Sequence, residues 1–299
     1  GYHGMNIGGI SVGGMVSNRK TFSNILMPNV HHLRHTHLPE NLFVKGEPET
    51  GADLADDLER IAANIGPENI AACIVEPIAG STGTLVPPKG YLQKLRDICD
   101  KHGILLIFDE VITGWGRTGY PFAAQAFDVT PDIMTMAKAV TNGVVPLGAV
   151  ASRENIYDTV LDASPMGAVE FFHGYTYSAI PVSMAAGLAM QNIIEKENLF
   201  QRSKDMSPYF LDGLFSLKDI DVITDIRGYG MMGGIDIHLD ERPGKAGYTC
   251  FKKLFEAGLS LKATGDCLIV APPFVCETEH IDEIIEKLRT GITNYMKSK

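Results

Sequence analysis

The sequence predicts an α/β fold in which a mostly parallel sheet is followed by a smaller α/β lobe. Three short, continuous apolar runs, at residues 70–75, 104–108 and 133–136, are typical of strands buried on both faces. Between the first two runs, residues 91–102 place their apolar side chains on one helical face, and Gly103 follows as a stop signal. A strand, a helix and a strand at this spacing predict a parallel βαβ unit.

The pattern changes near residue 181, where Ala, Met and Leu become frequent in a helical segment that runs to about residue 200. Beyond it, strands are expected at 231–239 and 267–270, and helices at 248–257 and 279–295. We therefore expect a large domain at residues 1–200 and a small C-terminal domain at residues 201–299.

Composition limits the class of protein. Of the 299 residues, 45% are hydrophobic and 21% are charged, which is enough apolar material for a large core. The net charge of −10, from 36 acidic and 26 basic residues, argues against a nucleic-acid partner. No apolar run approaches the roughly eighteen residues of a membrane span, so no membrane partner is expected.

The five cysteines form no C-x-x-C pair, which favours a reducing compartment, and we expect a cytoplasmic protein. Histidines occur at positions 31, 32, 35 and 37, but in a Pro- and Asn-flanked stretch without the helical H-E-x-x-H pattern of a zinc site. A surface or interface loop is the better interpretation, and no metal is expected.

Three polar residues follow the three apolar runs: Glu76, Asp109 and Lys138. Because ligands bind at the carboxyl ends of strands in open α/β sheets, we expect two carboxylates and an amine to share one sheet edge. A single residue of this kind could be a structural ion pair or a solvent-facing charge, but three together indicate a site. A lysine amine can bond covalently to an aldehyde cofactor, and a carboxylate can hold the protonated nitrogen of its ring.

The motifs around these residues resemble those of the class III pyridoxal-phosphate-dependent aminotransferases. The resemblance covers essentially the whole chain and is closest to the ω-amino-acid (β-alanine)–pyruvate branch of that family. The similar segments are, in chain order, the Tyr-His-Gly at position 2, the Glu-Pro-Ile-Ala-Gly at 76, the Phe-Asp-Glu-Val at 108 with the glycines through 119, the Pro-Asp…Lys at 131–138 and the segment at 173–178. The resemblance implies a fold-type-I enzyme with pyridoxal 5′-phosphate as its cofactor.

Residue by residue, the resemblance implies that Lys138 forms the Schiff base with the cofactor and moves protons. Asp109 would pair with the pyridine nitrogen, and Val111 would pack on one face of the ring. Tyr2 would stack on the opposite face and also contact the substrate. Glu76 would belong to the polar network around Asp109.

The resemblance also implies an assembly. Thr176 would donate to the cofactor phosphate of a neighbouring subunit, so the active site would need a homodimer or homotetramer. A small-residue turn that binds the phosphate would precede Tyr2, and because the chain opens directly on Gly1 we expect an N-terminal part of the domain to be missing from the sequence.

One departure concerns the substrate. The branch has R-x-T-G-D where this chain has Lys262-Ala263-Thr264-Gly265-Asp266. Lysine supplies a positive charge without the planar two-pronged contact of arginine. Carboxylate binding at Lys262 is therefore expected to be weaker or differently directed, and a surface lysine is the alternative.

The expected activity is transfer of an amino group from an ω-amino acid or amine to pyruvate by a ping-pong mechanism. An aminomutase or decarboxylase with the same cofactor is an alternative. A nicotinamide-dependent oxidoreductase that uses the glycines at 114–119, which follow a strand but open no clear helix, is a less favoured one. A non-catalytic relative of the family is a further alternative, but it would not explain why Glu76, Asp109 and Lys138 all stand at strand ends.

Overall fold

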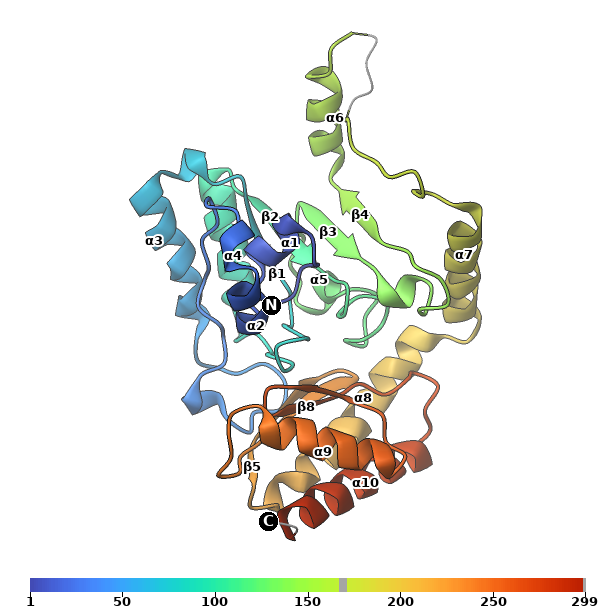
Figure 1. Cartoon of the computed structure of the whole chain (residues 1–299). Coiled ribbons are helices and arrows are strands. Elements are labelled where there is room, and N and C mark those ends of the chain that lie inside the picture. Colours follow the sequence, from blue (N-terminus) through green and yellow to red (C-terminus); the bar gives the residue numbers. More distant parts are fainter. Residues whose placement is uncertain (167–170, 298–299) are drawn as a thin grey trace.

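The computed structural model describes residues 1–166 and 171–297, and its first sheet has the predicted architecture (Figure 1). The strands are β1 (Ala72–Val75), β2 (Leu105–Asp109), β3 (Ile133–Met136) and β4 (Ala149–Ser152), in that spatial order. The first three are parallel, and β4 is antiparallel to β3. The sheet is therefore mostly parallel, as the sequence predicts.

Helix α4 (Tyr91–His102) connects β1 to β2 and buries its apolar face against the sheet. It ends at Gly103, whose φ of +69° is the left-handed cap for which glycine carries no steric penalty. Helix α3 (Asp56–Ile65) packs beside α4. Buried side chains from β1, α4 and β2 form one hydrophobic cluster with those of neighbouring loops.

The remaining helical segments of the N-terminal two thirds are short, apart from those of the arm described below. They are α1 (Ile7–Val12), α2 (Val16–Thr21), α5 (Ala123–Ala126) and the 3₁₀ turns Ser23–Ile25, Pro39–Asn41, Ala52–Ala55, Pro67–Asn69 and Lys138–Val140.

An arm leaves the first sheet after β4. It carries α6 (Glu154–Asp162) and returns to α7 (Pro181–Lys196), and Figure 1 shows α6 projecting away from both sheets. Large apolar side chains are exposed on this arm and on α7, including Phe172, Tyr177 and Leu188. Exposure of this kind marks a surface suited to burial against another protein chain.

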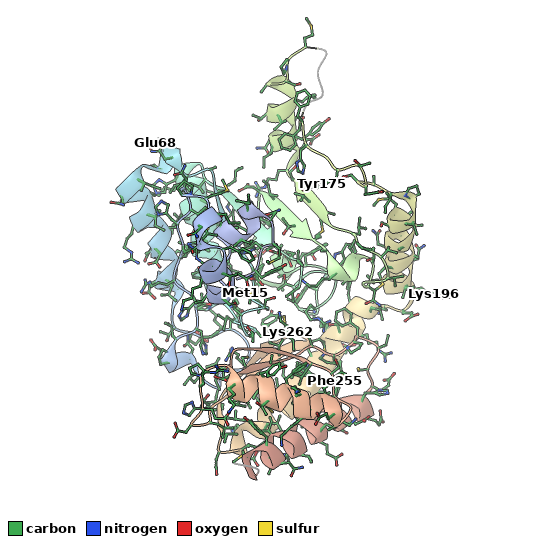
Figure 2. The ribbon with its side chains drawn as sticks, viewed as in Figure 1. Met15, Glu68, Tyr175, Lys196, Phe255 and Lys262 are labelled. Carbon is green, nitrogen blue, oxygen red and sulfur yellow. The ribbon has the colours of Figure 1, made fainter. Side chains whose placement is uncertain are left out.

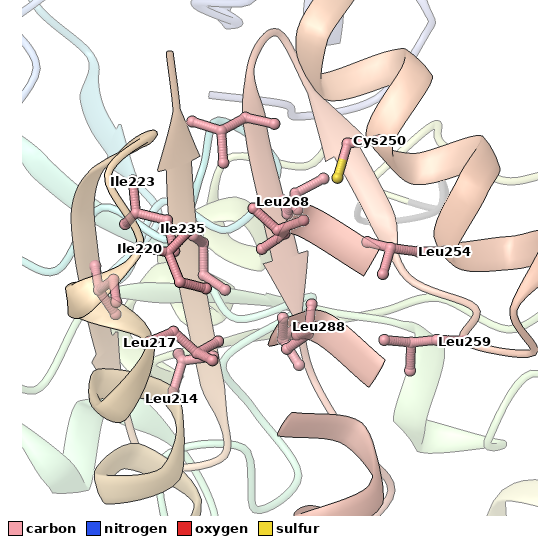
Figure 3. Packing of buried hydrophobic residues seen from close by; sticks show 14 of the residues in the cluster. Leu214, Leu217, Ile220, Ile223, Ile235, Cys250, Leu254, Leu259, Leu268 and Leu288 are labelled. Atoms are coloured by element: carbon pink, nitrogen blue, oxygen red, sulfur yellow. The ribbon is translucent and has the colours of Figure 1, made fainter. Parts of the chain in front are cut away.

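The second sheet has four antiparallel strands in the order β5-β6-β8-β7. They are β5 (Ile223–Tyr229), β6 (Met232–Ile237), β7 (Lys262–Thr264) and β8 (Cys267–Val270), joined by α8 (Leu199–Phe215), a 3₁₀ turn at Ser216–Asp219, α9 (Lys245–Glu256) and α10 (Thr278–Lys297). Figure 3 shows the core between this sheet and its helices, where Leu214, Ile235, Leu268 and Leu288 meet.

The sequence does not predict strands β4, β5 and β7, and it does not predict how the strands of the second sheet pair. Strand β4 has one large apolar residue and β7 has only three residues, so neither gives a clear pattern. Strand β5 buries Asp225 and Arg227 as an ion pair, which breaks the alternation of apolar residues. The smaller lobe therefore contains α-helices on an antiparallel sheet, rather than further parallel βαβ units.

Two arginines, the partly buried Arg117 and the buried Arg227, connect the sheets. Arg117 donates to the carbonyls of Met231 and Pro272, each at 2.8 Å, and Arg227 donates from Nε to the carbonyl of Gly83 at 2.8 Å.

Helix α8 begins at Leu199, close to the expected domain boundary at residue 200, but the division itself stays a prediction. In the described part of the chain, no helix combines the length and apolarity that a membrane crossing requires.

We predict that Leu106→Ala lowers the free energy of unfolding by about 2–5 kcal/mol, because Leu106 is fully buried in the central strand β2. Urea unfolding monitored by circular dichroism measures the change. Val275→Ala is the matched control, since Val275 is 57% exposed in a loop and should shift the free energy by less than about 0.5 kcal/mol. Equal losses in the two variants would contradict the placement of Leu106 in the core.

Candidate functional site

The strand register brings the three predicted polar residues to one edge of the first sheet. Val75 lies opposite Phe108, and Asp109 lies opposite Thr135. Glu76 and Asp109 therefore stand at the carboxyl ends of neighbouring parallel strands, and Lys138 follows the third strand at the same edge. The structure thus reproduces the arrangement expected from the sequence.

Asp109 is only 6% exposed, and both of its carboxylate oxygens have partners. Oδ1 accepts a 3.0 Å hydrogen bond from the backbone N–H of Val111. Oδ2 lies 2.7 Å from Nδ1 of His3, whose side chain is also buried. His3 is not among the residues predicted for the site, although it lies in the Tyr-His-Gly motif, because its partner is 106 positions away in the chain.

Glu76 fixes two segments of backbone at the same edge. Its Oε1 accepts a 3.2 Å hydrogen bond from the N–H of Tyr2, and its Oε2 accepts one of 2.9 Å from the N–H of Gly80. The first contact positions Tyr2, whose side chain is 37% exposed, and the second holds the turn at residues 80–84. Glu76 therefore positions the site in this structure, and stacking of the Tyr2 ring stays a prediction.

Lys138 opens a 3₁₀ turn with a φ of +49°, in the left-handed region that a residue with a β-carbon rarely occupies. Such strain is often found at functional sites. Burial lowers the pKa of Lys138, and the positive charge of Lys262 lowers it further, while the carboxylates of Asp109 and Glu76 oppose the shift. A lower pKa leaves more of the amine neutral and able to attack a carbonyl carbon.

Lys262 is the first residue of β7, and Figure 2 shows it between the two sheets. Its Nζ lies 3.2 Å from Oγ of Ser81, in the turn that follows Glu76. The side chain therefore faces the first sheet from the second. Lys262 is itself exposed, so the structure leaves the alternative of a surface lysine open, and carboxylate binding at Lys262 stays a prediction.

Val111 and Thr176 differ in their relation to the site. Val111 is half-buried and follows Asp109 directly. Thr176 is exposed and begins a turn on the returning half of the arm, where Figure 2 shows its neighbour Tyr175 far from Lys262. Within residues 1–166 and 171–297, Thr176 makes no hydrogen bond to Glu76, Asp109 or Lys138.

The glycine-rich segment at 114–119 forms a closed set of turns. Gly119 donates to the carbonyl of Gly116, and Trp115 donates to that of Pro121. The helix that follows, α5, has four residues, and its first N–H groups are bound by the carboxylate of Glu110. The segment does not open a long helix that could bind a dinucleotide phosphate.

Among the four clustered histidines, His37 faces two carboxylates. One ligand atom from each of His37, Asp225 and Asp236 lies within 4.8 Å of the others. The guanidinium of Arg227, however, pairs with both carboxylates, at 2.6 Å and 2.8 Å. This cation already pairs with both carboxylates within the second sheet, which gives them a structural role. The expectation that the cluster binds no metal stays a prediction.

A cavity of about 1280 Å³ runs along the free edge of β1, which pairs only with β2 in the described chain. Its walls come mainly from residues 69–77 and 29–37. It reaches the site at Glu76 and His3, but Lys138 and Asp109 are not among its described lining residues. This cavity is therefore adjacent to the edge that carries Glu76, Asp109 and Lys138, and its described lining reaches that edge only at Glu76 and His3.

Comparisons with known proteins agree with this geometry. The family model described as "Aminotransferase class-III" matches residues 1–292. An omega-aminotransferase of Caulobacter vibrioides is 52% identical over 293 residues, and a beta-alanine–pyruvate aminotransferase of Pseudomonas aeruginosa is 47% identical over 289 residues. Among solved structures, the omega transaminase from Pseudomonas jessenii in complex with PMP superposes with a TM-score of 0.89 at 31% identity.

The matches cover nearly all of this chain but only part of the related proteins. They take in 97% and 96% of the chain, against 66% of the Caulobacter relative and 64% of the Pseudomonas aeruginosa one. The structural match covers 99% of this chain and 67% of the other. The chain thus spans about two thirds of the length of the curated relatives that it matches.

The lowered pKa of Lys138 predicts how fast an amine-reactive reagent labels it. Asp109→Asn removes an opposing charge that raises this pKa, so the pH at which Lys138 is half-reactive should move to lower values. Labelling at a series of pH values, followed by peptide mass spectrometry of protein stripped of small molecules, measures the midpoint. The exposed Lys218 serves as the internal control, since its labelling profile should be the same in both proteins. A midpoint that stays in place or rises would show that Asp109 does not act on Lys138.

Proposed function

The chain belongs to the class III aminotransferases, and on that premise we propose that the protein transfers an amino group from an ω-amino acid or amine of the β-alanine type to pyruvate. The reaction would follow a ping-pong course. The observation that carries the proposal is the placement of Glu76, Asp109 and Lys138 at one sheet edge, where a lysine of lowered pKa faces two buried carboxylates. The names of the relatives support the choice of substrates.

The residues present fit pyridoxal 5′-phosphate at two of its ends. Lys138 supplies the amine that the aldehyde carbon requires, and Asp109 supplies a buried carboxylate for the ring nitrogen. When bound, the cofactor supplies an aldehyde for covalent attachment and an electron-withdrawing ring. Val111 and Tyr2 are proposed to pack against opposite faces of that ring.

Each side chain at this sheet edge has a separate proposed role. Lys138 would hold the cofactor through its amine and would take and return a proton at Nζ as general base and acid. Asp109 would pair with the ring nitrogen and favour its protonated form, and His3 and the N–H of Val111 hold the carboxylate in place. Glu76 positions the backbone of Tyr2. Tyr2 and Lys262 are proposed to contact the substrate.

We propose a homodimer, or a tetramer of such dimers, in which Thr176 acts in the site of the neighbouring subunit. Thr176 lies on the arm, which extends away from the Lys138 edge of its own chain and carries exposed aromatic side chains such as Phe172 and Tyr177. Burial of these side chains against a second copy would remove a large apolar surface from water. A cytoplasmic location is also proposed, and the thiols of all five cysteines are free.

Lys138→Ala is expected to lower the rate of alanine formation from pyruvate and β-alanine by more than a thousandfold, because both the covalent attachment and the proton transfer are lost. Alanine is measured by chromatography, which also separates a transaminase from an aminomutase or a decarboxylase. Lys218→Ala removes an exposed lysine and is the matched control. Turnover by Lys138→Ala at the control's rate would exclude the assignment.

Mixing two inactive or weakened variants tests the role of Thr176. In a mixed dimer of Thr176→Ala and Lys138→Ala subunits, one site receives an intact lysine from the first subunit and an intact threonine from the second. Its affinity for the cofactor should therefore exceed that of the Thr176→Ala homodimer by about tenfold, the contribution of one hydrogen bond to a charged group. Fluorescence titration of pyridoxal phosphate measures the affinity. If the mixture binds no better than Thr176→Ala alone, Thr176 does not act across the subunit boundary.

A further inference from the structure

The contact between Lys262 and Ser81 brings together two groups from different sheets. Lys262 is placed by β7, where it pairs in register with Ile269 of β8. Ser81 is placed by the turn at residues 80–84 after β1. Their polar atoms, Nζ and Oγ, lie 3.2 Å apart although 181 positions separate the residues in the chain.

The turn that carries Ser81 is held rigidly. Glu76 accepts from the N–H of Gly80, and a backbone pair between Ala79 and Leu85 closes the loop. Arg227 donates to the carbonyl of Gly83, whose φ is +119°. Thr84 is also in the left-handed region, at +58°, which is unusual for a β-branched residue. Ser81, 7% exposed, is therefore fixed in position.

The charge of Lys262 has no counter-ion nearby. Within residues 1–166 and 171–297, no carboxylate lies within salt-bridge distance of its Nζ. The ammonium has three hydrogens to donate and uses one on the Ser81 oxygen. Because that oxygen accepts from Lys262, the hydrogen of the Ser81 hydroxyl is left to donate elsewhere, and no acceptor for it is found in the same described ranges.

We propose that Ser81 and Lys262 together bind the substrate carboxylate, the hydroxyl and the ammonium each donating to one of its oxygens. The proposal rests on the proposed function and deepens it by assigning a carboxylate-binding residue that belongs to no motif identified in the sequence. A lysine alone is a point charge without directional pairing. A fixed hydroxyl beside it supplies the second donor that a guanidinium would carry within one side chain.

This arrangement predicts a difference between donors with and without a carboxylate. Mixing the holoenzyme with β-alanine or with propylamine, in the absence of pyruvate, gives a single half-reaction that is followed by the absorbance of the cofactor. Ser81→Ala should lower the specificity ratio of β-alanine to propylamine by about tenfold, the effect of one hydrogen bond to a charged group. Ser81→Thr keeps a hydroxyl and should restore most of the ratio. Ser216→Ala removes an exposed hydroxyl far from the site and is the control.

Arginine at position 262 provides the sharper test. Because a guanidinium has two prongs of its own, Ser81→Ala should lower the ratio by less than about threefold in a Lys262→Arg background. An equal loss in the lysine and arginine backgrounds would overturn the shared role of the two donors. An unchanged specificity ratio of β-alanine to propylamine in Ser81→Ala would overturn it as well.

Propionate, a carboxylate without an amine, tests the same pair without turnover. Its dissociation constant, measured by calorimetry, should rise about tenfold in Ser81→Ala and remain unchanged in Ser216→Ala. If the wild-type protein converted neither donor, the proposed function would fail, and the propionate measurement would still decide the role of Ser81. Unchanged propionate binding in Ser81→Ala would refute that role.

Discussion

The arrangement of the site depends on one buried carboxylate, that of Asp109, which must find partners for both of its oxygens. Asp109 ends the inner strand β2 and is only 6% exposed. The contacts with His3 and with the N–H of Val111 provide partners for both oxygens, as a buried charge requires. The N-terminal segment must therefore lie against the carboxyl edge of the sheet, and this places Tyr2 there as well. The same charge moderates the effect of burial on Lys138.

A second set of charged residues, centred on the buried Arg227, connects the second sheet to the turn after β1. Arg227, held by Asp225 and Asp236, reaches across to the carbonyl of Gly83. The turn that it holds carries Ser81, which meets Lys262 from the second sheet. Groups that would act on the reacting amine thus come from the first sheet, and a group suited to a carboxylate comes from the second. The two sets of groups are not independent, because the positive charge of Lys262 also lowers the pKa of Lys138.

The parts of the fold that depend on local patterns are predictable from the sequence, and those that depend on distant contacts are not. Strands β1, β2 and β3 are short and mostly apolar, and Glu76, Asp109 and Lys138 stand at or just past their carboxyl ends. The side chains of His3 and Ser81 escape prediction because their partners lie 106 and 181 positions away and no local period marks them. Strand β5 is also missed, because an arginine such as Arg227 is expected at the surface. Its burial becomes understandable only from its ion pair with Asp236 on the neighbouring strand. The role expected of Thr176 comes from family resemblance alone.

The central claim is that the amine of Lys138 bonds covalently to an aldehyde cofactor. Incubation of the protein with pyridoxal 5′-phosphate, reduction with borohydride and peptide mass spectrometry test it most directly. The account predicts that the pyridoxyl group is found on the peptide that contains Lys138, and that Asp109→Asn weakens cofactor binding without moving the label. A label that resides on Lys262 or is spread over exposed lysines, with Lys138 unmodified, would contradict it.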